Sequence, residues 1–382
     1  MTKQPSYRFT GLEDDWKEVK LGEVFDIVTD YVANGSFESL RNNVKTYEKD
    51  NFAYMIRLQD ASNSWKGPWL YTDEKGYNFL SKSRLFKDDI LMSNVGTVGR
   101  FFQVPELDRP MTLAPNSVLI RSTSSNNQFL YFMMLTANIQ DQIAMRKTPG
   151  VQDKINKTDF KKVIATLPSL LEQTAIGSFF QDIDQLISLQ QRKLEVLKEQ
   201  KKTYLKLLFP AKGQTKPALR FAGFEDEWKE VKLGEIIKSI SSKNYITEYS
   251  KEGNNPVIQQ GDIPIVGFSD NKPFNNFSNV ILFGDHTLSL FKPETPFLLA
   301  TDGIKILHSD LTTQSFLFIM LERYLPKSQG YKRHYSLLKN ELSSLPSLPE
   351  QEAIGSFFQD LDKAIAKQEE KVNQLKESKQ TL

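Results

Sequence analysis

The sequence contains no cysteine among its 382 residues. That absence excludes a disulfide framework, a zinc site with cysteine ligands and a cysteine nucleophile. No run of about 18 apolar residues occurs, so we expect no membrane-spanning helix. The polar N-terminal residues lack the apolar core of a signal peptide, which makes a cytoplasmic location the default expectation.

Motifs of common catalytic sites are also missing. The sequence has no G-x-x-x-x-G-K-[ST] phosphate loop, no G-x-G-x-x-G after a strand, and no Asn or Asp followed by Pro-Pro and an aromatic residue. Asp285 and His286 place an acid beside a base, but neighbours on a strand point to opposite faces. The three histidines, which include His308 and His334, lack metal-ligand spacing. We therefore expect a non-catalytic chain with no metal or cofactor of its own.

Charge of one sign is not in large excess, because 49 Lys and Arg against 47 Asp and Glu leave a net charge of +2. This balance does not by itself indicate a nucleic-acid-binding protein. The length allows two or three domains. What the sequence has instead is a strong internal repeat, which is the first feature to interpret.

Two segments occur twice with few changes. Residues 8–23 (RFTGLEDDWKEVKLGE) return at 220–235 with three differences, and residues 167–182 (LPSLLEQTAIGSFFQD) return at 345–360 with two. The copies are offset by 212 and 178 residues, so the second interior is 34 residues shorter. Between these segments the halves diverge almost completely. Duplication followed by drift would erode ends and interiors alike, so a fixed frame around exchanged interiors indicates a constant partner for the frame and different targets for the interiors.

Each copy of the second repeated segment opens a long predicted helix. Ser169 with Glu172, and Ser347 with Glu350, have the spacing of a capping box. Apolar residues then recur at alternating steps of four and three, which is typical of a coiled coil. The two seams include Ile176, Phe180, Ile183 and Gln190 in the first helix, and Ile354, Phe358, Leu361 and Gln368 in the second.

We expect these two helices to pair antiparallel, although a helical hairpin of unrelated function has the same pattern. Each interior precedes its own helix, and the short link after Phe209 can enter the second half beside that same helix end. A parallel pair would require the chain to travel back along the whole helix. Gln190 and Gln368 hold equivalent polar positions, so we predict that they meet.

The interiors are predicted to be rich in strands. Short apolar runs at 89–92, 117–120 and 279–282 are broken by Gly, Asn, Asp and Pro, whereas 128–144 and 315–325 have helical patterns. The sequence thus predicts an α+β fold in which two pseudo-symmetric α/β domains are joined by two long antiparallel coiled-coil helices. The predicted divisions are a first domain, a central helix, a second domain and a C-terminal helix, at 1–166, 167–210, 211–344 and 345–382.

The frame is carried by LPSLLEQTAI and LPSLPEQEAI, and by WKEVKLGEV and WKEVKLGEI. It resembles the conserved regions of type I restriction–modification specificity subunits. The interiors contain similar segments of that family, namely DDILMSNVGTVGR at 88–100, APNSVLIR at 114–121, FGDHTLSLFKPETPFLLATDGIKIL at 283–307 and GYKRHYSLLKN at 330–340. The resemblance covers nearly the whole chain. It departs where the second helix reaches Leu382 without a counterpart of Lys206–Pro210.

The resemblance implies that each α/β domain is a target-recognition domain that reads part of a split site in double-stranded DNA. It also implies two adenine-N6 methyltransferase subunits as partners, and two restriction subunits that act as ATP-driven translocase-nucleases in the full enzyme. S-adenosylmethionine, ATP and Mg would be used by these partners. Two other interpretations stay open. One is a self-contained methyltransferase-nuclease of the related two-domain kind, against which the missing motifs argue, and the other is a scaffold whose interiors bind proteins.

A basic segment precedes each long helix. The first, at 145–162, has six Lys or Arg, and the second, at 323–339, has five and no acidic residue. Basic side chains bind phosphates, while side chains that reach base edges select the sequence. The predicted DNA-contacting residues are Thr97, Arg146, Lys147, Gln152, Lys154, Lys332, Arg333, His334 and Tyr335.

Each of these candidates has an alternative interpretation. The basic segments can be solvated loops, and Gly96–Gly99 around Thr97 can be a hairpin turn rather than a DNA-backbone contact. Gly330 has the conformational freedom to turn the following residues toward a groove, so we predict that Lys332, Arg333 and His334 contact the second half-site only. Trp16 and Trp228 belong to the frame, and we expect them to be packing anchors rather than base-stacking residues.

Overall fold

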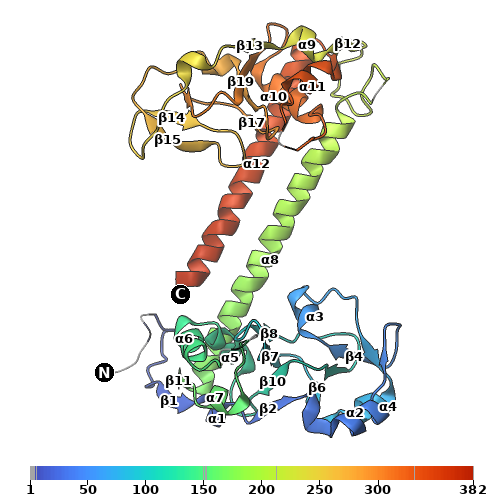
Figure 1. Cartoon of the computed structure of the whole chain (residues 1–382), viewed down its shortest axis with the longest axis vertical. Coiled ribbons are helices and arrows are strands. Elements are labelled where there is room, and N and C mark those ends of the chain that lie inside the picture. Colours follow the sequence, from blue (N-terminus) through green and yellow to red (C-terminus); the bar gives the residue numbers. More distant parts are fainter. Residues whose placement is uncertain are drawn as a thin grey trace. The chain divides into compact units, whose positions relative to one another are not determined.

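The computed structural model describes residues 5, 7–148, 150, 153–211, 213–330 and 332–381. The chain divides into two compact units (Figure 1). Unit 1 comprises residues 1–187 with 375–382, and unit 2 comprises 188–374. Each unit combines small sheets with helices, as the α+β expectation required.

The repeated segments close both units in the same way. In unit 1, β1 (Lys17–Lys20) pairs antiparallel with β11 (Ile164–Leu167). In unit 2, β12 (Lys229–Lys232) pairs antiparallel with β20 (Leu342–Leu345). A short helix follows the first strand of each pair, and its first leucine is fully buried. These helices are α1 (Leu21–Val24) and α9 (Leu233–Ile236).

A four-stranded antiparallel sheet has the same strand order in both units. Its members in unit 1 are, in spatial order, β2 (Ile27–Asp30), β10 (Val118–Arg121), β7 (Ile90–Met92) and β8 (Phe101–Gln103). Those in unit 2 are β13 (Lys238–Ile240), β19 (Ile304–His308), β16 (Ile281–Gly284) and β17 (Leu290–Phe291). The apolar runs predicted at 89–92, 117–120 and 279–282 thus form or overlap β7, β10 and β16.

A further sheet differs between the units and accounts for part of their difference in length. In unit 1 it runs β3 (Thr46–Tyr47), β5 (Tyr71–Thr72), β4 (Ala53–Ile56), β9 (Met111–Leu113) and β6 (Arg84–Leu85). In unit 2 it runs β15 (Ile265–Ser269), β14 (Asn255–Ile258) and β18 (Leu298–Leu299). Both contain one parallel pair, β4 with β9 and β14 with β18.

Short helices surround these sheets. Unit 1 has α2 (Phe37–Asn43), α3 (Leu58–Ser62), α4 (Glu74–Phe79), α5 (Asn127–Met134), α6 (Ala137–Met145) and α7 (Lys157–Lys161), with 3-10 turns η1 (Tyr31–Asn34) and η2 (Ser81–Ser83). Unit 2 has α10 (Gln314–Arg323) and α11 (Tyr335–Asn340), with η3 (Lys243–Tyr245) and η4 (Phe277–Asn279). The prediction of a single helix at 128–144 is wrong in one respect. It is divided at Leu135–Thr136, because Thr136 is extended and its hydroxyl donates to Met133 O.

The two long helices are α8 (Leu170–Leu207) and α12 (Leu348–Thr381). Within unit 2 they run in opposite directions, since Gln190 contacts Gln368, Lys201 contacts Asp362, and Tyr204 packs on Phe357 (Figure 1). The antiparallel pairing is therefore confirmed. In the described part of the chain, no helix is sufficiently long and apolar to cross a membrane.

Candidate nucleic-acid interface

Ion pairs to two buried glutamates hold the repeated segments together. The carboxylate of Glu172, at the start of α8, accepts hydrogen bonds from Arg8 Nε and Nη2 at 2.9 and 2.6 Å. Glu350, at the start of α12, accepts from Arg220 at 2.7 Å and from Trp228 Nε1 at 3.2 Å. The hydrogen bond to Glu172 raises the pKa of Arg8. The predicted capping-box glutamates thus connect segments that are 164 and 130 residues apart.

The glutamines that follow these glutamates fix the interior to the frame. Gln173 accepts from the N–H of Asn126, the N-cap of α5, and donates to Pro168 O. Gln351 makes the matching bonds to Thr313, the N-cap of α10, and to Pro346. The repeated Glu-Gln pair therefore places one interior helix at a set position in each unit.

The predicted coiled-coil residues lie on the packed side of the long helices. Ile354 and Phe358 are buried, while Ile176, Phe180, Ile183 and Leu361 are half-buried. Gln368 is 7 % exposed, and its side-chain amide donates to Gln190 Oε1 at 2.9 Å and to Gln190 O at 2.9 Å. The predicted meeting of the two glutamines is confirmed.

In unit 1, the first basic segment packs against the loop between β7 and β8. Val95 and Lys154 form an isolated bridge, and Gly96 N–H donates to Asp153 O at 2.9 Å. Gly96 and Gly99 have φ of 77° and 85°, and the loop joins two antiparallel strands. The hairpin-turn interpretation of this loop is therefore confirmed. The same geometry brings Thr97 and Lys154, which are both exposed, to one end of the sheet.

The other candidates of the first basic segment are partly engaged within unit 1. Arg146 is half-buried and donates to Gln142 O at 3.0 Å, and Lys147 forms a 3.2 Å ion pair with Asp153. Gln152 lies outside the described residues. The segment thus presents an exposed Lys154 beside two basic side chains that are held by neighbouring acceptors.

In unit 2, the second basic segment packs against the matching loop between β16 and β17. Asp285 follows β16 and is 2 % exposed. Its carboxylate accepts from the backbone N–H of His334 at 2.9 Å and of Tyr335 at 2.7 Å, at the start of α11. Each unit therefore places its basic segment at the same end of the same strand.

His334 does not have the exposure that direct contact with DNA requires. The residue is 0 % exposed. Its Nε2 accepts from Gln329 N–H at 3.0 Å, which requires the proton on Nδ1, and Nδ1 faces Asp285 O at 3.0 Å. The expectation that His334 touches DNA is therefore corrected, because both ring nitrogens are used to fold the segment.

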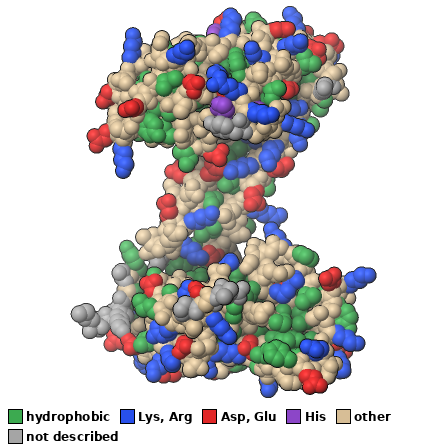
Figure 2. Space-filling model, in the orientation of Figure 1, with side chains coloured by type: hydrophobic (Ala, Val, Ile, Leu, Met, Phe, Trp, Pro, Cys, Tyr) green, Lys and Arg blue, Asp and Glu red, His purple; other side chains and the backbone are tan. Residues whose placement is uncertain are grey.

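The remaining candidates of the second basic segment are accessible to different degrees. Lys332 and Arg333 are exposed, and Arg333 lies 3.7 Å from Asp302. Tyr335 is half-buried against Phe283, and burial raises its pKa. Gly330 has a φ of 77°, in agreement with the predicted turn. Figure 2 shows a group of Lys and Arg side chains beside a His on the visible face of unit 2.

A family model described as "Type I restriction modification DNA specificity domain" matches residues 13–199 and 225–377. The chain belongs to this family. It is 26 % identical to the putative type I restriction enzyme MjaX specificity subunit of Methanocaldococcus jannaschii over an alignment of 416 residues. The alignment covers 97 % of this chain and 95 % of the relative. The MjaVIII specificity subunit of the same organism is 24 % identical over 66 % of this chain and 68 % of the relative.

Solved structures have the same fold as this specificity-family chain. The type I restriction–modification S subunit from M. genitalium aligns with a TM-score of 0.61 and 16 % identity, over 98 % of this chain and 96 % of that one. A structure described as the basis of complex assembly and conformational transition of the type I R-M system aligns with a TM-score of 0.53 and 17 % identity, over 97 % of each chain. The fold class is therefore two pseudo-symmetric domains with long connecting helices.

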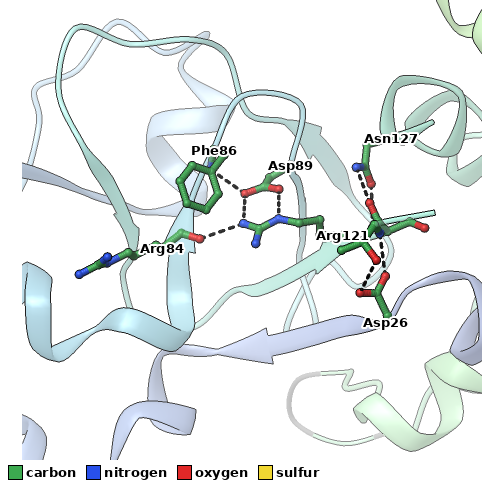
Figure 3. A network of polar contacts seen from close by, with 8 residues as sticks. Asp26, Arg84, Phe86, Asp89, Arg121 and Asn127 are labelled. Carbon is green, nitrogen blue, oxygen red and sulfur yellow. Dashed lines mark hydrogen bonds and ion pairs between the residues drawn. The ribbon is translucent and has the colours of Figure 1, made fainter. Parts of the chain in front are cut away.

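One buried polar network was not predicted from the sequence. Asp89, which is 2 % exposed, binds the guanidinium of Arg121 and accepts from Phe86 N–H at 2.7 Å (Figure 3). Arg121 also donates to Arg84 O at 3.0 Å. Both charged residues stand in segments that carry the family resemblance, DDILMSNVGTVGR and APNSVLIR. Their opposite charges were the available signal, but the separation of 32 residues hid the contact.

Asp285 uses its carboxylate oxygen Oδ1 on two backbone N–H groups, so it caps α11. Among the described residues, no group of three His, Asp or Glu side chains is arranged to hold a metal ion. In unit 2, a buried polar group thus supports the segment that carries the exposed basic side chains.

Proposed function

We propose that this specificity-family chain is a non-catalytic subunit that reads a split site in double-stranded DNA, with one half-site contacted by each unit. The observation that carries the proposal is the repeated placement of two unrelated basic segments. One segment packs on the β7–β8 loop and the other on the β16–β17 loop, at equivalent ends of equivalent strands. Two domains that bind different DNA sequences need contact segments at the same location but with different residues.

The proposed division of labour separates affinity from base selection. Lys154, Lys332 and Arg333 are exposed and positively charged, so they supply contacts to phosphates or to base edges. Thr97 is exposed in the hairpin loop, which is bridged to Lys154 through Val95. Asp285, His334 and Tyr335 keep the second basic segment folded. They contribute to DNA binding by fixing the position of that segment.

The frame is proposed to dock the partner subunits. Its sequence is nearly identical in both halves, which suits two copies of one methyltransferase subunit, and the restriction subunits join that complex. We propose that S-adenosylmethionine, ATP and Mg²⁺ are bound by these partners and that this chain holds no cofactor. The long antiparallel helices, α8 and α12, give the two units a common connection.

Selection from a randomised duplex by the chain in complex with a methyltransferase subunit tests this proposal. The variant pair Lys332→Ala and Arg333→Ala should weaken discrimination at one half-site, and Lys147→Ala with Lys154→Ala at the other. A lost base contact costs about 1–3 kcal/mol at one position, whereas a lost phosphate contact weakens binding to all sequences and reduces the salt slope by about 1.

Exposed lysines outside the basic segments provide matched controls. Lys87→Ala in unit 1 and Lys272→Ala in unit 2 each remove one positive charge elsewhere, and both should leave the selected motif unchanged. If the basic-segment variants select the same motif with the same affinity as the parent, these segments are solvated loops. If both variant pairs alter the same half-site, the assignment of one half-site to each unit is wrong.

A further inference from the structure

The loop between β14 and β15 in unit 2, residues 259–264 (QQGDIP), is attached to the loop between β16 and β17. Gln260 Oε1 accepts a hydrogen bond from the backbone N–H of His286 at 3.1 Å. The N–H of Gly261 donates to Ser289 Oγ at 2.9 Å. The β16–β17 loop also carries the buried aspartate that holds the second basic segment, so the β14–β15 loop belongs to the same surface of unit 2.

Two glycines allow the Gln260 side chain to pack closely on this surface. A β-carbon at Gly284 would lie 2.8 Å from Cβ of Gln260, and one at Gly303 would lie 2.7 Å from its Nε2. Gly303 follows Asp302, which lies 3.7 Å from the exposed Arg333. The side chain of Gln260 therefore fixes the β14–β15 loop between the end of β16 and the start of β19, beside a proposed DNA-contacting residue.

The β14–β15 loop is also closed by hydrogen bonds of its own. Gln259 N–H donates to Pro264 O at 2.7 Å, and Gln259 Nε2 donates to Ile263 O at 2.9 Å. These bonds fix the backbone on both sides of the Ile263 side chain, which is 71 % exposed. Single exposed apolar side chains are common on protein surfaces, so exposure alone assigns no role to Ile263. Its place on a rigid loop beside the second basic segment does.

The composition of the β14–β15 loop suits contact with bases rather than with phosphates. The loop contains no Lys or Arg, and its Asp262 is exposed. Phosphates repel this carboxylate, whereas base edges in the major groove also present apolar and amino groups. The apolar group on those edges is the C5 methyl of thymine. An exposed isoleucine beside basic side chains is therefore complementary to a thymine in the bound duplex.

We propose that Ile263 is a specificity-determining residue of unit 2, which contacts the C5 methyl group of a thymine in one half-site. The assignment rests on the proposed function, in which unit 2 reads DNA. Lys332 and Arg333 attract the duplex to this surface, and Ile263 selects a base pair on it. Gln260 is a positioning residue, because its side chain attaches the β14–β15 loop to the rest of the surface.

The equivalent strand of unit 1 is followed by a different loop. Ala300 N–H donates to Ile258 O at the end of β14, and in the same way Ala114 N–H donates to Ile56 O at the end of β4. After β4 the chain forms a longer loop of unrelated sequence, residues 57–70, which includes α3. The thymine contact of the β14–β15 loop is therefore expected in the half-site of unit 2 only.

Replacing thymidine by deoxyuridine, which removes only the C5 methyl group, tests the contact. The full chain in complex with a methyltransferase subunit is titrated with its selected duplex, in which each thymidine is replaced in turn. One replacement, in the half-site that Lys332→Ala and Arg333→Ala alter, should weaken binding about fourfold, the value of one buried methyl group. Ile263→Ala should bind the thymidine and deoxyuridine duplexes with affinities that agree within about twofold.

Leu311→Ala is the matched control, because it removes an apolar residue of unit 2 that is 55 % exposed outside this surface. It should keep the fourfold preference of the parent for thymidine. The inference is overturned, and split recognition stands, if the half-site contains no thymine, if deoxyuridine has no effect in it, or if Ile263→Ala keeps the full preference. Weaker binding of Ile263→Ala to every duplex, without a preference of the parent, would indicate an apolar wedge between base pairs and also overturns it. A parent that selects no specified block overturns the proposed function itself.

Discussion

Units 1 and 2 share one sheet order but hold it with different buried carboxylates. In unit 1, Asp89 stands immediately before β7 and binds Arg121. In unit 2, the residue before β16 is the buried Val280, and the carboxylate is Asp285, immediately after the strand. The two units thus share the topology of the sheet, but the buried carboxylate precedes the strand in unit 1 and follows it in unit 2. Asp285 of unit 2 also holds the basic segment of that unit in place.

The largest expected effect comes from replacing Asp89, the anchor of unit 1, with valine, the residue type that precedes β16 in unit 2. Asp89→Val leaves the largely buried Arg121 guanidinium without its carboxylate and should lower the free energy of unfolding by about 3 kcal/mol. Urea unfolding followed by circular dichroism measures the loss. Because a buried ion pair can be replaced by apolar residues at little net cost, Asp89→Val with Arg121→Leu should recover most of it. Equal stability of the single variant and the parent would contradict this account.

The next effect concerns the anchor of unit 2. Asp285→Ala removes the acceptor of two backbone N–H groups and should cost about 2 kcal/mol. Hydrogen exchange at His334 and Tyr335 should become at least about tenfold faster, since that ratio corresponds to about 1.4 kcal/mol of lost protection. Asp302→Ala is the control, because its carboxylate is 75 % exposed and only near Arg333. Unchanged exchange in the Asp285 variant would mean that the segment is held by other contacts.

A smaller effect is expected where α8 and α12 meet. Gln368→Leu leaves the Gln190 amide without its side-chain donor and should destabilise the pair by about 1 kcal/mol. The double replacement by leucine should restore stability and weaken the selection of one register, as polar pairs in coiled-coil seams specify alignment at some cost in stability. Disulfide trapping between cysteines introduced at exposed positions of α8 and α12 reports the register. A single trapped register in the double variant would show that the glutamines do not specify it.

The smallest expected effect is on the pH dependence of stability. It concerns equivalent positions at which unit 1 has an acidic residue and unit 2 a basic one. Asp26 accepts from Thr123 N and Oγ1, whereas its counterpart Lys238 pairs with Asp310. Burial raises the pKa of Asp26, but the hydrogen bonds from Thr123 outweigh it, so the pKa is lowered from 3.8. The hydrogen bond from Lys238 lowers the pKa of Asp310.

Both groups therefore stabilise the fold above pH 3.8, and the contribution is lost as pH falls through the lowered pKa. NMR titration of the side-chain carboxyl carbons should give midpoints below 3.8 for both. Thr123→Val should raise the midpoint of Asp26 and leave that of Asp310 unchanged, whereas Lys238→Met should do the reverse. A midpoint of Asp26 that does not move in Thr123→Val would show that the hydroxyl has no part in the shift.

Much of the frame was predictable because the repeat itself carries the information. Seams with matching registers predicted that the two helices pair and that Gln190 meets Gln368, and the short link after Phe209 predicted that the pair is antiparallel. The short strands within the interiors were visible as apolar runs, but their sheet order was not, since pairing depends on contacts between distant segments. The turn at Thr136 was missed because a local hydroxyl contact interrupts an otherwise helical pattern.

The candidate site was predictable by location and less so by residue. The basic segments were found from charge alone, and the structure places both at equivalent ends of a sheet. His334 was taken for a contact residue because its sequence neighbours are basic, while its burial depends on Asp285, 49 residues away. Glu172 was interpreted through a local capping pattern, and its buried carboxylate pairs with Arg8, 164 residues away. Long-range partners, rather than local propensity, decided both residues.

The central claim is that each unit reads its own half of a split DNA site. The most direct measurement is selection from a randomised duplex by the chain with a methyltransferase subunit, repeated with a chimaera in which residues 237–341 come from another family member. The account predicts two specified blocks with unspecified base pairs between them, and a chimaera that changes one block only. A single block, or a chimaera that changes both blocks, would contradict it.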